Sequence, residues 1–305
     1  MSMSNLIETF HPLSADERPA EQAALAAIGA YFADATGTMR DAYDNMTAHT
    51  PVAAGVTTER VDSPETRGWW VRPEKAANDR AVLFVHGGAY MLGSAKAYRG
   101  FASQIAVRSG VSVFVLDYPL APEHPFPAAF DAAAAAPQWL KAQGYNQIAL
   151  AGDSAGGAMV LASLAVERSE WPSVSAVIVF SPWIDLTLSG PSLLDPDTHD
   201  PVFKPEILAA AVDKYLAGAD PRDGRASPLF AIPDSLPPLA IQVGTDELLL
   251  DDARRYAAAA ATRGGEVRLD IYDGLHHVFQ RSTEELPSAG NALDAAAQFL
   301  SDHWH

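Results

Sequence analysis

The 305-residue sequence contains no cysteine, and this absence removes several classes of protein at once. A disulfide framework, a thiolate nucleophile and a cysteine-ligated metal site are all excluded. Only histidine and carboxylate side chains remain as zinc ligands, and the nine histidines show no H-E-x-x-H spacing. We therefore expect no metal site.

Basic residues are also scarce, with 21 Lys and Arg against 38 Asp and Glu and a formal net charge of −17. Because phosphate contacts need clustered Lys and Arg, this balance argues against nucleic-acid and anionic-membrane partners. The first residues lack the basic start and apolar run of a signal peptide, and no run of about 18 uncharged apolar residues follows. These absences predict a cytoplasmic protein without stable membrane association.

The most informative segment that is present is Gly-Asp-Ser-Ala-Gly at residues 152–156. It follows a strand-like run at 148–151 and precedes an alanine-rich helical pattern. A serine between two glycines at such a strand-to-helix turn is typical of a nucleophile elbow, in which the hydroxyl projects at a helix N-terminus. The segment predicts Ser154 as the nucleophile of an acyl-transfer reaction.

A second segment, His-Gly-Gly at residues 86–88, ends another buried-strand run. Glycine lets backbone N–H groups come close to a ligand, and acyl transfer needs such donors at the developing oxyanion. We predict the N–H groups of Gly87, Gly88 and Ala155 as the oxyanion hole.

A serine nucleophile also needs a base and an acid that orients it, which α/β-hydrolases supply in the chain order Ser, Asp or Glu, His. Asp246 and Glu247 directly follow a predicted strand and its glycine, and of these two we predict Asp246 as the acid. His276 and His277 follow the next predicted strand, and composition alone does not separate them. Asp251 and Asp252 lie further along, where acidic residues at a helix N-terminus are common.

Five motifs in this order resemble those of the bacterial hormone-sensitive-lipase-like family of α/β-hydrolases. They cover about residues 80–300 and lie at 86–89, 117–129, 152–157, 246 and 274–279. By the family pattern the catalytic histidine stands two residues before the aromatic residue. The resemblance therefore implies His277 as the base and matches Ser154 and Asp246 to the other two roles. This sequence departs from the family at Ala89, where many members have glycine, and at His276, where an apolar residue is common.

The resemblance also implies a function: hydrolysis of small-molecule esters with short acyl chains by a serine carboxylesterase, without a cofactor. It further implies a possible homodimer through a sheet edge. Lactone or activated-amide hydrolysis is a close alternative, because the same groups serve both reactions. A non-catalytic small-molecule receptor is a more distant one, and the presence of His277 argues against it.

Alternating patterns along the chain predict a mostly parallel α/β sheet of eight strands flanked by helices. The strands are expected at 57–61, 68–72, 82–86, 111–116, 148–151, 174–180, 239–243 and 267–272. The helices are expected at 19–34, 39–48, 97–109, 128–142, 156–168, 206–216, 249–263 and 288–303.

The long connection after the sixth predicted strand is rich in proline, which indicates an inserted cap at about residues 186–225. We predict that it joins an N-terminal cap segment, residues 1–55, over a catalytic domain at 56–305. Substrate-pocket candidates are Tyr90, Met91, Phe203, Tyr215 and His276. The proline-rich segment 117–125 predicts a rigid connection whose Glu123 helps to anchor the oxyanion loop.

Overall fold

The computed structural model describes residues 5–166 and 168–304. Its centre is a nine-stranded sheet in the order β1-β9-β8-β7-β6-β4-β5-β3-β2. In this sheet β3 pairs antiparallel with both of its neighbours, β2 and β5, and the other strand pairs are parallel. The strands are β1 (Leu6–His11), β2 (Val56–Asp62), β3 (Arg67–Pro73), β4 (Ala77–Val85), β5 (Val111–Leu116), β6 (Gln147–Asp153), β7 (Ser173–Phe180), β8 (Leu239–Asp246) and β9 (Val267–His276).

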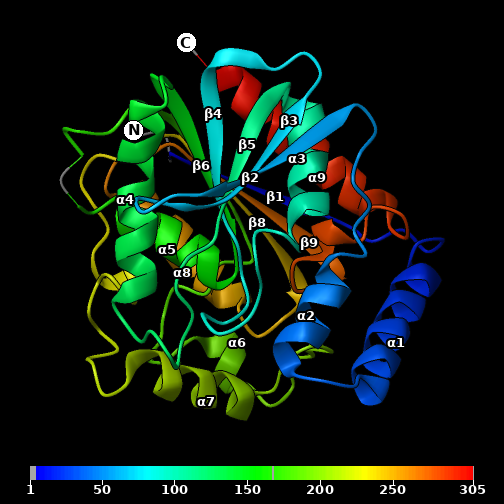
Figure 1. Cartoon of the computed structure of the whole chain (residues 1–305). Helices are drawn as coiled ribbons and strands as arrows, with labels where there is room; N and C mark the ends of the chain where they lie inside the picture. The colour runs from blue at the N-terminus through cyan, green and yellow to red at the C-terminus, as the bar shows by residue number, and fades with distance from the viewer. Residues whose placement is uncertain (1–4, 167, 305) are drawn as a thin grey trace.

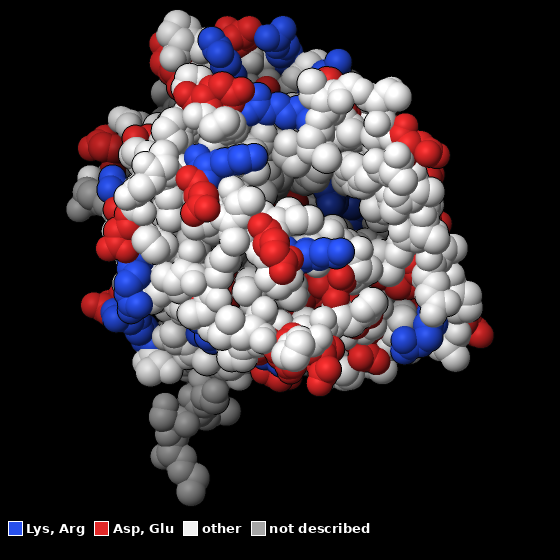
Figure 2. All heavy atoms as spheres, turned by 90° about the horizontal axis from the view of Figure 1, so that it is seen from below, with Lys and Arg blue, Asp and Glu red and all other residues white. Residues whose placement is uncertain are grey.

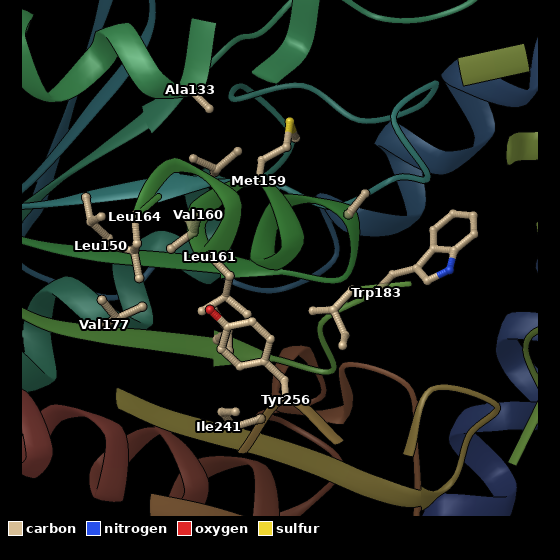
Figure 3. Packing of buried hydrophobic residues seen from close by; sticks show 14 of the residues in the cluster. Ala133, Leu150, Met159, Val160, Leu161, Leu164, Val177, Trp183, Ile241 and Tyr256 are labelled. Atoms are coloured by element: carbon tan, nitrogen blue, oxygen red, sulfur yellow. The ribbon is translucent and has the colours of Figure 1, made fainter. Parts of the chain in front are cut away.

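Alternate side chains of the inner strands enter two apolar clusters, one on each face of the sheet. In β4, Leu83 and Val85 join the first cluster, whereas Val82 and Phe84 join the second. The first face is covered by α4 (Ala128–Ala142), α5 (Ala155–Ser163) and α8 (Leu250–Thr262), and the second by α3 (Arg99–Ser109) and α9 (Pro287–His303). Figure 3 shows Leu150, Val177 and Ile241 of β6, β7 and β8 on the first face, with Leu161 of α5 and Tyr256 of α8.

The sheet has one strand more than the sequence patterns predict. Residues 6–11 form β1, which pairs in parallel with β9 along Leu6–His11, so this part of the predicted N-terminal cap segment belongs to the sheet. β1 was missed because an edge strand need not be buried, and Ile7 and Phe10 are indeed exposed. Residues 1–4, residue 167 of the predicted helix 156–168 and residue 305 lie outside the described part of the chain.

Four helices gather at the end of the molecule toward which β8 and β9 run (Figure 1). They are α1 (Arg18–Asp34) and α2 (Met39–Thr47) from the N-terminal segment, and α6 (Pro191–Leu194) and α7 (Pro205–Leu216) from the long connection after β7. The start of α2 is a capping box, in which Thr38 Oγ1 accepts from the Asp41 N–H and the Asp41 carboxylate accepts from the Thr38 N–H.

Two short 3₁₀ helices, η1 (Pro228–Phe230) and η2 (Phe279–Arg281), complete the list of elements. Within the described residues, no helix is both long enough and apolar enough to span a bilayer.

Candidate active site

Ser154 lies at the turn between β6 and α5, as the elbow pattern predicts, with φ 52° and ψ −121°. A positive φ is strained for a residue that has a Cβ, and it holds the serine in a sharp turn. The neighbouring glycines make room for this turn, since a Cβ on Gly156 would lie 2.0 Å from the carbonyl oxygen of Val85. Ser154 is only 7% exposed, and the surface that it retains lines a cavity.

His277 follows β9 and lines the same cavity. Its Nδ1 lies 2.7 Å from Oε2 of Glu247. Its Nε2 is buried and has no hydrogen-bond partner among the described residues. The Phe203 ring packs edge-on against the imidazole at 5.0 Å between centroids. One nitrogen is therefore held by a carboxylate, and the other is unpaired.

The carboxylate that holds His277 belongs to Glu247, so the prediction of Asp246 for this position is wrong. Glu247 is completely buried, and its Oε1 accepts from the Gly244 N–H at 2.7 Å and the Ser181 hydroxyl at 2.8 Å. Asp246 is half-buried, and its side-chain hydrogen bond is to Thr245. Burial raises the pKa of Asp246.

Strand geometry explains this correction, because successive side chains at the end of a strand point in opposite directions. Asp246 is the last residue of β8 and pairs with His276 in the sheet register. Glu247 and His277 are each one residue further on. The directions in which the segments after β8 and β9 leave the sheet thus decide which acid meets which histidine. Residue type alone does not reveal these directions.

The predicted oxyanion hole needs one change. The Gly87 N–H donates to Asp153 Oδ1 at 2.8 Å, and Asp153 Oδ2 accepts from the Tyr98 hydroxyl at 2.9 Å. Gly87 therefore fixes the loop and is already engaged as a donor. Gly88 and Ala89 both have positive φ, 117° and 52°, and neither N–H donates to a described residue.

Arg40 of α2 ties the oxyanion loop to the proline-rich segment. Its guanidinium donates to the carbonyls of Met91 and Ala121, each at 2.9 Å, and to the carboxylate of Glu123 at 2.6 Å. The hydrogen bond from Arg40 lowers the pKa of Glu123 to about 2. Glu123 thus contacts the loop through Arg40, the residue that sequence reasoning missed because it lies about 50 positions upstream of the loop.

The cavity has a volume of about 1340 Å³ and opens on the face of the molecule that Figure 2 shows. Its walls are largely apolar, and the inner face of α1 contributes alanines, Leu25, Ile28 and Phe32. Three of the predicted pocket residues, Met91, Phe203 and His276, line it.

The other two pocket candidates, Tyr90 and Tyr215, do not line the cavity, so the prediction of these two residues is wrong. Their rings stack on each other at 3.7 Å between centroids, and both residues are buried. The apolar area that they bury fastens the oxyanion loop to α7. These two large aromatic side chains belong to the core between cap and sheet.

His276 connects the cap to the loop that carries His277. Oε1 of Glu21, in α1, accepts from the His276 N–H at 3.1 Å and lies 2.6 Å from its Nδ1. Glu17, just before α1, accepts in the same way from the N–H and hydroxyl of Ser288 in α9. Two buried carboxylates therefore hold the first turns of α1 against the sheet domain.

No group of three or more His, Asp or Glu side chains in the described ranges is arranged to hold a metal ion. The site consists instead of a strained serine, an imidazole with a buried carboxylate on its far nitrogen, and unengaged backbone donors. The sheet order, the elbow and the covering helices together define an α/β-hydrolase.

Comparison with known proteins gives the same class. The family model described as the alpha/beta hydrolase fold matches residues 82–281. The chain is 37% identical to an esterase of Acinetobacter venetianus over 239 residues, which cover 77% of this chain and 78% of the relative. It is 38% identical to an acetyl-hydrolase of Streptomyces hygroscopicus over 234 residues, 76% of this chain and 78% of the relative.

Solved structures agree with these sequence relatives. An esterase of the bacterial hormone-sensitive lipase family superposes with a TM-score of 0.87 at 36% identity, covering 93% of this chain and 98% of that one. The chain belongs to the α/β-hydrolase family and, within it, to the bacterial hormone-sensitive-lipase-like esterases. It is a carboxylic ester hydrolase.

Proposed function

We propose that Ser154, His277 and Glu247 are the nucleophile, the base and the orienting acid of a serine carboxylesterase. The Ser154 hydroxyl attacks the ester carbonyl while His277 Nε2 takes its proton. The protonated imidazole then gives this proton to the departing alcohol, leaving an acyl-enzyme. Water, deprotonated by the same nitrogen, attacks the acyl group; the bond to Ser154 Oγ then breaks, the imidazole returns the proton to this oxygen, and the acid is released.

Glu247 holds Nδ1 of the imidazole, and this hydrogen bond leaves Nε2 as the basic nitrogen. When the imidazole takes the Ser154 proton it becomes positively charged, and the negative charge of the adjacent Glu247 carboxylate stabilises it. The Gly88, Ala89 and Ala155 N–H groups stabilise the tetrahedral oxyanion. Ala155 opens α5, where the first N–H groups have no intrahelical acceptor.

The observation that carries this proposal is the buried, unpaired Nε2 of His277, in the same cavity as the strained Ser154 and with Glu247 on its other nitrogen. Burying an unpaired polar atom is costly, and a role as the proton acceptor for Ser154 explains why this nitrogen is left without a partner inside the cavity.

We further propose a preference for short acyl chains. A relative at 38% identity is named an acetyl-hydrolase. A structure at 33% identity, with a TM-score of 0.84, is of a protein soaked with p-nitrophenyl butyrate. Both concern those proteins, and they support the same class of substrate for this chain. Cytoplasmic location and a homodimer stay predictions, which cell fractionation and sedimentation would test.

The test is hydrolysis of p-nitrophenyl esters from acetate to palmitate by the wild type, Ser154→Ala and His277→Ala. We expect activity that is highest with short chains and falls at least about 10³-fold in either variant, as for other serine hydrolases. Full hydrolysis by folded Ser154→Ala would refute the proposed site. A folded wild type that cleaves no ester of the series would favour a lactone, an amide or a receptor role.

A further inference from the structure

The cavity contains one arginine, Arg281, for which the esterase reaction provides no role. Arg281, the last residue of η2, lines the cavity four positions after His277. The described basic residues of the lining are Arg40, Lys214 and Arg281.

These three cations differ in how their charge is balanced. Arg40 is paired with Glu123 at 2.6 Å, and Lys214 is exposed to solvent. Arg281 is half-buried and has no carboxylate within 4.0 Å among the residues that the structure describes. Arginine stays protonated even when buried, so its charge remains in the cavity.

The hydrogen bonds that Arg281 makes are few and long. Nη1 donates to the hydroxyls of Tyr43 at 3.3 Å and Thr47 at 3.5 Å. Neither Nε nor Nη2 donates to any side chain or carbonyl in the described ranges. An arginine commonly presents these nitrogens as a planar fork that fits a carboxylate. Part of the guanidinium therefore remains available to a molecule in the cavity.

One carboxylate whose charge acts on the Arg281 guanidinium is that of Asp153, which is buried beside Ser154. It is linked to Arg281 only through a relay, in which Tyr43 and Tyr98 share a hydrogen bond of 2.9 Å and Tyr98 donates to Asp153. Both Asp153 oxygens already accept hydrogen bonds, from Gly87 and from Tyr98. Asp153 is thus engaged in fixing the oxyanion loop and offers Arg281 no direct ion pair.

We propose that Arg281, together with the Thr47 hydroxyl, forms an anion subsite in the active-site cavity, and that the preferred esters carry a carboxylate on the acyl or the alcohol part. The inference rests on the proposed esterase function and narrows its substrate class. A substrate carboxylate accepts hydrogen bonds from the guanidinium nitrogens that have no partner in the described part of the protein. The largely apolar walls of the cavity strengthen this interaction. The net charge of −17 repels anions at a distance, so the selection must come from this local contact.

The test compares matched esters that differ only in the carboxylate, followed by pH-stat. Monomethyl adipate against methyl hexanoate probes the acyl side, and 4-acetoxybutanoate against butyl acetate probes the alcohol side. In the wild type we expect kcat/KM for the charged member of at least one pair to exceed that for the neutral member. In Arg281→Gln this ratio should fall about tenfold or more, the value of one charge-assisted hydrogen bond. Arg281→Lys, which keeps the charge without the fork, should fall between the two.

The control is Lys141→Gln, on the exposed side of α4 and outside the cavity lining, which removes the same charge from the molecule. It should leave both ratios at the wild-type value. If Arg281→Gln slows the charged and neutral esters equally, or lowers only the melting temperature, Arg281 is an anchor for α2 and the subsite is refuted.

A second readout separates failure of this inference from failure of the esterase proposal. Glutarate should raise the melting temperature of the wild type and of Ser154→Ala, and should not raise that of Arg281→Gln. This shift requires no turnover. Hydrolysis without a glutarate shift and without a charge preference would support the esterase proposal and refute the anion subsite. A glutarate shift without any hydrolysis would support the anion subsite and refute the esterase proposal.

Discussion

Asp246 and Glu247 are neighbours with the same charge, yet their surroundings give them different roles. Glu247 is buried and makes three hydrogen bonds, to Gly244, Ser181 and His277. Asp246 is half-buried and bonds to Thr245. The longer glutamate side chain reaches an imidazole from a position just past the end of β8. At this scale, direction and reach decide which acid serves the histidine.

We predict that Glu247→Gln lowers kcat by about 10²- to 10⁴-fold, because an amide in place of the carboxylate no longer stabilises the protonated imidazole. Asp246→Asn is the matched control and should lower kcat by less than roughly tenfold, since it does not contact His277. Steady-state kinetics with p-nitrophenyl butyrate measures both variants. A larger loss in Asp246→Asn than in Glu247→Gln would contradict this assignment.

Among the elements, α1 depends most on a few contacts. Glu21 is the fully buried residue of this helix, and the apolar face lines the cavity instead of packing in the core. Its attachment therefore rests largely on Glu17, Glu21 and the hydrogen bond from the Tyr31 hydroxyl to the carbonyl of Ala42. An element held in this way forms a wall that can be loosened without unfolding the sheet.

We predict that Glu21→Gln weakens the docking of α1 by about 1–3 kcal/mol, the cost of disturbing a buried hydrogen bond to a carboxylate. Limited proteolysis should then cut the α1 segment faster, and KM should rise more than kcat falls, because α1 is a wall of the substrate cavity. Gln22→Ala, one residue along on the exposed side, is the control. Equal cleavage rates in Glu21→Gln and the wild type would show that this carboxylate does not hold the helix.

For the whole molecule, the buried Asp252 links stability to pH. It accepts from the N–H groups of Ile184 and Asp185 and from Arg255, which joins α8 to the loop after β7. Burial raises the pKa of Asp252 from its ordinary value of 3.8 to about 7, against the opposing effect of Arg255. The folded protein therefore holds this proton more tightly than the unfolded chain does.

The raised pKa of Asp252 predicts the direction in which the free energy of unfolding changes with pH. The contribution of Asp252 to stability is fully present below about pH 4 and is lost as the pH rises toward 7, because only the unfolded chain releases the proton easily in that range. The free energy of unfolding of the wild type, relative to that of Asp252→Asn, should thus decrease from pH 4 to pH 7. Urea denaturation across this range measures the difference. A difference that is constant or increases with pH would contradict the raised pKa.

The sequence by itself determined the parts of this protein that depend on local pattern. Buried strand runs, helical periodicity and the Gly-Asp-Ser-Ala-Gly segment predict eight of the nine strands, the longer helices and the elbow at Ser154, because each depends on residues adjacent in the chain. The ordered motifs also predict the family. The edge strand β1 escaped prediction because two of its three apolar residues, Ile7 and Phe10, are exposed instead of buried.

Only the tertiary structure decided how residues distant in the sequence pair in space. It paired His277 with Glu247 and His276 with Glu21, engaged Gly87 with Asp153, and stacked Tyr90 on Tyr215 outside the cavity. It also brought Arg281 to the cavity without a carboxylate partner in the described ranges. In the sequence, two neighbouring positions each offer a carboxylate and two others each offer an imidazole, and composition does not choose between them. The direction in which the chain leaves a strand makes that choice.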